Sequence, residues 1–93
     1  MLTHNNIVNA VKKAASQFPL TKAAYFSSYA EHLATEESDL DLLVEFEQSS
    51  VSILIIISLK HFLEDQLSKS VVIIHAPIPE TAILEIGKQV SVL

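Results

Sequence analysis

Apolar residues recur at intervals of three and four near the start of the chain, which is the spacing of one face of an α-helix. The positions are Ile7, Val8, Val11, Ala14 and Ala15. Either Thr3 or Asn5 is available as the N-cap, and Pro19 disfavours helix in the residues before it. The pattern therefore predicts an amphipathic helix that ends near Gln17.

Three short apolar runs predict strands. They are residues 21–26 (TKAAYF), 40–46 (LDLLVEF) and 70–76 (SVVIIHA). The run at 40–46 alternates little between apolar and polar positions at its centre, which predicts a strand flanked on both sides in the sheet. Residues 35–39 (TEESD) are polar and are predicted to form a loop.

Three further segments are predicted to be helical. A short helix is expected from Ser27, because serine hydroxyls satisfy free backbone amides in a first turn. The run at 51–67 is rich in β-branched residues but exceeds ordinary strand length, so we expect a helix buried nearly all round at its start. Pro79 and Glu80 suit the first turn of a last helix that continues to residue 93. The predicted fold is α/β (α+β), a small mixed sheet of about three strands flanked by helices.

Composition narrows the classes of protein that fit. The 93 residues predict a single domain, 1–93, and 49% hydrophobic residues favour a packed core with apolar surface left for a partner or for self-association. A net charge of −5 argues against non-specific binding to nucleic acid. The most hydrophobic stretch, residues 51–59, is too short to span a membrane, and the N-terminus lacks the pattern of a signal peptide. With no cysteine, the chain fits a cytoplasmic protein.

Two aspartates introduce the candidate chemistry. Residues i and i+2 on a strand point to the same face about 6.5–7 Å apart, so Asp39 and Asp41 would aim two carboxylates one way. This arrangement suits Mg²⁺, which takes one or two carboxylates and completes its shell with water and substrate phosphates. A helix start at Ser27 and Ser28 would offer backbone amides and a hydroxyl to a phosphate. The alternative is a solvated turn in which the aspartates cap the preceding loop.

The segment FSSYAEHLATEESDLDLLVEF resembles the signature of the minimal nucleotidyltransferases (MNT) of the DNA polymerase β superfamily, and LKHFLEDQLSKSVVII resembles the helix and strand that follow it there. The resemblance implies a polymerase-β-like nucleotidyltransferase fold and Mg²⁺-dependent transfer of a nucleoside monophosphate from an NTP, expected to be ATP, to a hydroxyl. That hydroxyl can belong to a partner protein. Small members of the family pair with HEPN-domain toxins, as antitoxins or as AMP-transferring partners.

The resemblance also assigns roles to residues and marks departures from the family pattern. Asp39 and Asp41 would bind Mg²⁺ as the catalytic carboxylates, and Ser27 and Ser28 would hold the nucleotide phosphates. Ser27 replaces the family glycine, Glu31 replaces a basic residue, and Val72 stands where the third carboxylate is expected. Transfer is therefore expected to be weakened. Two alternatives remain: an inactive antitoxin-like subunit that neutralises a HEPN-type toxin by contact, and a nucleotide-binding homo-oligomer without a transfer step.

Overall fold

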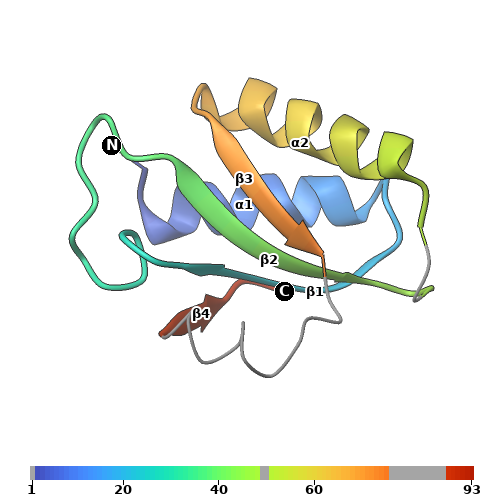
Figure 1. The fold of residues 1–93 in the computed structure, drawn as a ribbon, viewed down its shortest axis with the longest axis horizontal. Coiled ribbons are helices and arrows are strands. Elements are labelled where there is room, and N and C mark those ends of the chain that lie inside the picture. The colour runs from blue at the N-terminus through green and yellow to red at the C-terminus, as the bar shows by residue number, and fades with distance from the viewer. Residues whose placement is uncertain (1, 49–50, 76–87) are drawn as a thin grey trace.

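The computed structural model describes residues 2–48, 51–75 and 88–93 and forms one sheet covered by two helices (Figure 1). The elements are α1 (His4–Ala15), β1 (Leu20–Phe26), β2 (Leu40–Phe46), α2 (Ile53–Leu67), β3 (Val71–His75) and β4 (Gln89–Ser91). The strand order is β3-β2-β1-β4. Strand β1 runs antiparallel to both β2 and β4, whereas β2 and β3 are parallel and are connected through α2. The mixed sheet flanked by helices confirms the predicted fold class.

Helix α1 begins at a capping box. The side chain of Thr3 accepts a hydrogen bond from the backbone N–H of Asn6 at 3.1 Å, and the side chain of Asn6 accepts one from the backbone N–H of Thr3 at 3.0 Å. These bonds satisfy two amides that a helix start leaves free. Lys12 and Lys13 lie in the last turn, where positive charge complements the helix dipole. The helix ends at Ala15, close to the predicted end.

The hydrophobic core lies between the sheet and the helices. Along β2 the side chains of Leu40, Leu42, Val44 and Phe46 are buried and belong to the main core cluster. Helix α1 adds Ile7, Ala10, Val11 and Ala14, and helix α2 adds Leu59 and Leu63. Full burial of a leucine, isoleucine, valine or phenylalanine side chain contributes about 1.5–3 kcal/mol to the stability of the fold. Strand β2 has a neighbour on each side, as predicted, and its buried residues alternate with more exposed ones.

Helix α2 forms as predicted, but its expected burial is wrong. Ile53 and Leu54 are 70% and 71% exposed, and Ile57 is also exposed. Successive residues point about 100° apart around a helix, so an uninterrupted apolar run points in every direction. Only the stripe that carries Leu59 and Leu63 reaches the core. The start of α2 therefore presents apolar side chains to solvent.

The predicted short helix after β1 is also wrong. Residues 27–32 form a turn, in which the N–H of Glu31 donates to the C=O of Ser27 at 3.0 Å and the N–H of Leu33 donates to the C=O of Ser28 at 2.8 Å. Ser27 and His32 both adopt the left-handed conformation, with φ of 60° and 59°. Left-handed residues interrupt a right-handed helix, so the segment closes on itself after one turn.

The prediction of a last helix is also wrong over the described residues at the end of the sequence. Residues 89–91 form strand β4 where the sequence suggested helix, and the N–H of Val92 donates to the C=O of Ala23 at 2.9 Å. The alternation of polar Gln89 and Ser91 with apolar Val90 and Val92 has the period of a strand. The predicted helix start at Pro79 lies outside the described residues.

Neither α1 nor α2, the two helices that the structure describes, is long and apolar enough to cross a membrane.

Candidate active site on the outer face of the sheet

The face of the sheet opposite the helices carries the predicted aspartate on β2. We call it the outer face. Because Leu40 and Leu42 point toward the helices, Asp41 points away from them. Strand register places Asp41 opposite Phe26 of β1 and opposite Val72 of β3. Asp41 thus has neighbours on both sides within one row of the outer face.

The carboxylate of Asp39 lies close enough to Asp41 to affect its pKa. Asp39 is exposed just before β2, and Asp41 is partly buried. Burial raises the pKa of Asp41 above its ordinary value of 3.8, and the charge of Asp39 raises it further. Hydrogen bonding to the Ser27 side chain works in the opposite direction and lowers the pKa of Asp41. The structure therefore brings Asp39, Asp41 and Ser27 together.

Ser27 occupies a backbone conformation that favours glycine. Its φ of 60° lies in the left-handed region, where a Cβ atom costs roughly 1–2 kcal/mol. The glycine that the family pattern has at this position would adopt the conformation without that cost. Ser28 follows on the same turn and is half-buried. The turn takes the place of the helix start from which backbone amides were expected to face a phosphate.

The position beside Asp41 on β3 carries a hydrocarbon side chain. Val72 pairs with Asp41 in the parallel register and is 43% exposed on the same face. Within residues 2–48, 51–75 and 88–93, no group of three or more His, Cys, Asp or Glu side chains is arranged to hold a metal ion. Two carboxylates still fit Mg²⁺, which needs only one or two from a protein. The donor set therefore suits metal binding, while Val72 supplies no base.

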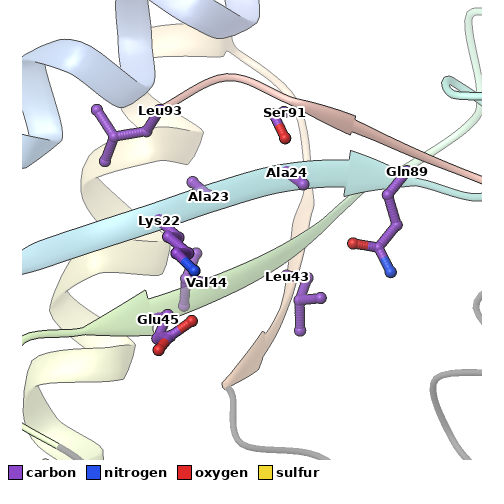
Figure 2. Close-up of a pocket in the computed structure, with 9 residues that line it drawn as sticks. All are labelled: Lys22, Ala23, Ala24, Leu43, Val44, Glu45, Gln89, Ser91 and Leu93. Atoms are coloured by element: carbon purple, nitrogen blue, oxygen red, sulfur yellow. The ribbon is translucent and has the colours of Figure 1, made fainter.

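A cavity of about 380 Å³ lies along the same face (Figure 2). It is lined by Lys22, Ala23, Ala24, Leu43, Val44, Glu45, Gln89, Ser91 and Leu93. Leu43 follows Asp41 at the next outward-facing position of β2, so the cavity begins one residue pair away from the aspartates. The cavity did not follow from the sequence, because three of its lining residues belong to β4 or to the chain just after it, where a helix was expected.

One protein-family model matches most of the chain. The model of the nucleotidyltransferase domain matches residues 6–90. No curated protein matches the chain significantly.

Solved structures share the fold. A toxin–antitoxin complex with AMP-PNP includes a chain that is 17% identical, with a TM-score of 0.76, covering 99% of this chain and 73% of that one. The complex of a tri-AMPylated Shewanella oneidensis HEPN toxin with an MNT antitoxin gives 15% identity and a TM-score of 0.65, covering 97% and 68%. A protein described as a minimal nucleotidyltransferase gives 28% identity and a TM-score of 0.72, covering 96% and 95%.

The family model spans nearly the whole chain, and the mixed sheet with its two helices agrees with these structures. This chain belongs to the nucleotidyltransferase domain family and shares its fold with structures described as minimal nucleotidyltransferases and MNT antitoxins.

Proposed function

We propose that this protein binds a nucleoside triphosphate together with Mg²⁺ at Asp39 and Asp41 and transfers the nucleoside monophosphate slowly to a hydroxyl. The observation that supports the proposal is the closeness of these two carboxylates at the start of β2, where the charge of Asp39 disfavours the charged form of Asp41. A divalent cation between them relieves this repulsion, since an opposite charge favours the charged form. When bound, Mg²⁺ would neutralise the phosphates and polarise the α-phosphate.

Each residue of the site has a separate role in this proposal. Asp39 and Asp41 hold the metal, and the Ser27 side chain favours the charged form of Asp41 that metal binding requires. Ser28, on the adjoining turn, contacts the phosphates. The turn is closed by its own backbone hydrogen bonds, which hold both serines in place beside the start of β2.

The transfer step explains why the rate is expected to be low. The acceptor oxygen forms a bond to the α-phosphorus, the bond between the α- and β-phosphates breaks, and pyrophosphate leaves. The hydroxyl proton must pass to a base. A carboxylate beside Asp41 on β3 would accept it, but that position is occupied by Val72, which cannot. Glu45 lies on the same strand but about 13 Å farther along it, which is too far. A general base typically contributes about 10²–10⁴-fold.

The acceptor is proposed to be a helical HEPN-type partner protein in the cytoplasm, with ATP as the nucleotide. Structural relatives were solved with such partners: one is an MNT antitoxin bound to a tri-AMPylated HEPN toxin, and another complex contains AMP-PNP. The exposed Ile53 and Leu54 at the start of α2 supply apolar surface of the kind that binds other proteins.

A second candidate function is neutralisation of the partner by contact alone. The observation that favours it is the same hydrocarbon side chain of Val72 beside Asp41, because a subunit that only binds has no need for a base. In this candidate the fold is retained as a binding surface, and the aspartates contribute nothing to neutralisation.

Transfer of label from α-labelled ATP to a co-purified HEPN-type protein separates the two candidates. The wild-type chain with Mg²⁺ should label the partner slowly, and the double variant Asp39→Asn/Asp41→Asn should not. Asp65→Asn is the matched control, because Asp65 is exposed on α2, away from the outer face. If the partner binds and is neutralised but stays unlabelled with every variant, the contact-only function is correct.

A further inference from the structure

The cavity on the outer face arises from one small side chain. Ala24 lies between Leu43 of β2 and Ser91 of β4, and its outward-facing neighbours on β1 are the larger Phe26 and Lys22. A short side chain surrounded by longer ones leaves a hollow with an apolar floor of Ala24 and Leu43. Its volume of about 380 Å³ lies in the range of sites that hold small organic ligands.

The hollow lies next to the candidate metal site along the direction of the strands. Strand register gives consecutive rows on the outer face: Asp41 with Phe26, then Leu43 with Ala24, then Glu45 with Lys22. Each row is displaced from the previous one by about 6.5–7 Å. The Ser27 turn lies at the Asp41 end of this line, and the cavity lies at the other. A nucleotide whose α-phosphate is at Asp41 needs only the span of its ribose to place a base over Ala24.

The polar groups of the cavity fit a neutral heterocycle better than another phosphate. Gln89, whose side chain projects to the same side of the strands as Leu43 in Figure 2, carries an amide that both donates and accepts hydrogen bonds. Ser91 adds a hydroxyl that can do both. Lys22 is the one cation among the described residues that line the cavity, and Glu45 stands opposite it in the register, so the positive charge is balanced.

We infer that this cavity receives the nucleobase of the bound nucleotide, with the ring over Ala24 and Leu43 and its edge read by Gln89. This inference rests on the proposed nucleotide binding and adds the determinant of base specificity. A side-chain amide pairs with a base edge that presents an adjacent donor and acceptor, which adenine has. The protein should therefore prefer ATP to Mg²⁺-bound phosphate chains that lack a base.

The test compares the affinities of Mg²⁺-ATP and Mg²⁺-tripolyphosphate by calorimetry. Wild-type protein should bind ATP more tightly. Ala24→Val adds two methyl groups to the floor of the hollow where the ring is inferred to lie, and should weaken ATP binding about tenfold or more while leaving tripolyphosphate binding unchanged. Gln89→Ala, which removes only an exposed side chain, should weaken ATP binding about three- to tenfold with tripolyphosphate again unchanged. Gln17→Ala is the matched control, because Gln17 is exposed at the end of α1, away from the outer face.

The outcomes distinguish failure of this inference from failure of the proposed function. If wild-type protein binds neither ATP nor tripolyphosphate with Mg²⁺, nucleotide binding itself is wrong, and the inference falls with it. If ATP binds and needs Asp39 and Asp41, but both cavity variants keep the wild-type affinity, only the nucleobase assignment is overturned. If the cavity variants lose transfer to the partner without losing ATP affinity, the cavity holds the acceptor, which also overturns the assignment.

Discussion

Val72 and Asp41 lie directly opposite each other on the parallel strands β3 and β2, on the same face of the sheet. Residues paired in this way have neighbouring side chains. A carboxylate in place of Val72 would therefore stand beside Asp41, where a base for the acceptor hydroxyl is missing.

The substitution Val72→Asp should raise transfer activity by up to about 10²–10⁴-fold, which is the usual contribution of a general base. Val72 is 43% exposed, so the new side chain can be hydrated and the fold should survive. Initial rates of label transfer measure the effect, and Val72→Asn is the control that matches the shape without the base. An equal gain in both variants, or no gain although Mg²⁺-ATP binds, would show that the missing carboxylate does not limit the rate.

Removal of the Asp41 charge should stabilise the fold near neutral pH. Because burial raises the pKa of Asp41, the folded state binds its proton more tightly than the unfolded state does. The contribution of Asp41 to stability is therefore favourable at low pH and is lost as pH rises from the ordinary value of 3.8 through the raised pKa. Asp41→Asn should show a gain in the free energy of unfolding that appears across this interval and then stays constant.

Urea unfolding of the wild type and Asp41→Asn at a series of pH values measures this difference. Since Asp41 is only partly buried, we expect a gain of a few tenths of a kcal/mol to about 1 kcal/mol. A loss of stability at neutral pH, or a difference independent of pH, contradicts the account of this carboxylate.

The Ser27 hydroxyl should hold down the pKa of Asp41. Ser27→Ala removes the hydrogen-bonding group whose effect opposes burial and the charge of Asp39, so the pKa of Asp41 should rise further. The carboxyl carbon chemical shift of Asp41, followed by NMR through an acid titration, reports this pKa. Ser28→Ala is the control and should leave the titration unchanged. Equal shifts in the two variants would mean that Ser27 has no specific contact with Asp41.

The start of α2 should tolerate polar substitution without loss of the fold. Ile53 and Leu54 are mostly exposed, so Leu54→Lys should change the free energy of unfolding by no more than about 0.5 kcal/mol. It should nevertheless weaken binding of the partner protein. Leu59→Ala, at a fully buried position of the same helix, should cost about 2–5 kcal/mol. Pull-down of the partner with Leu54→Lys is decisive: unchanged binding would remove the start of α2 from the interface.

Local periodicity was enough to predict most elements and the direction of Asp41. Helix α1, helix α2 and strands β1 to β3 follow from spacing and run length, and their observed ends lie within about two residues of the predicted ones. The same period of two that makes Leu40 and Leu42 core residues places Asp41 on the outer face.

Features that depend on distant pairing or on special backbone conformations were not visible in the sequence. The serines after β1 suggested a helix cap, but Ser27 adopts the left-handed conformation and turns the chain instead. The serine side chain does not predict that conformation. Strand β4 exists because β1 offers it an edge for pairing. The cavity over Ala24 exists only when β1, β2 and β4 are side by side, so its prediction requires the register of all three strands.

Calorimetric binding of ATP in the presence and absence of Mg²⁺ tests the central proposal, that Asp39 and Asp41 together hold a metal–nucleotide complex. Wild-type protein and Asp65→Asn should bind ATP only with Mg²⁺, and Asp39→Asn/Asp41→Asn should bind neither the metal nor the nucleotide while remaining folded. Binding of Mg²⁺-ATP by the folded double variant at wild-type affinity, or no binding by the wild type, would contradict the proposal.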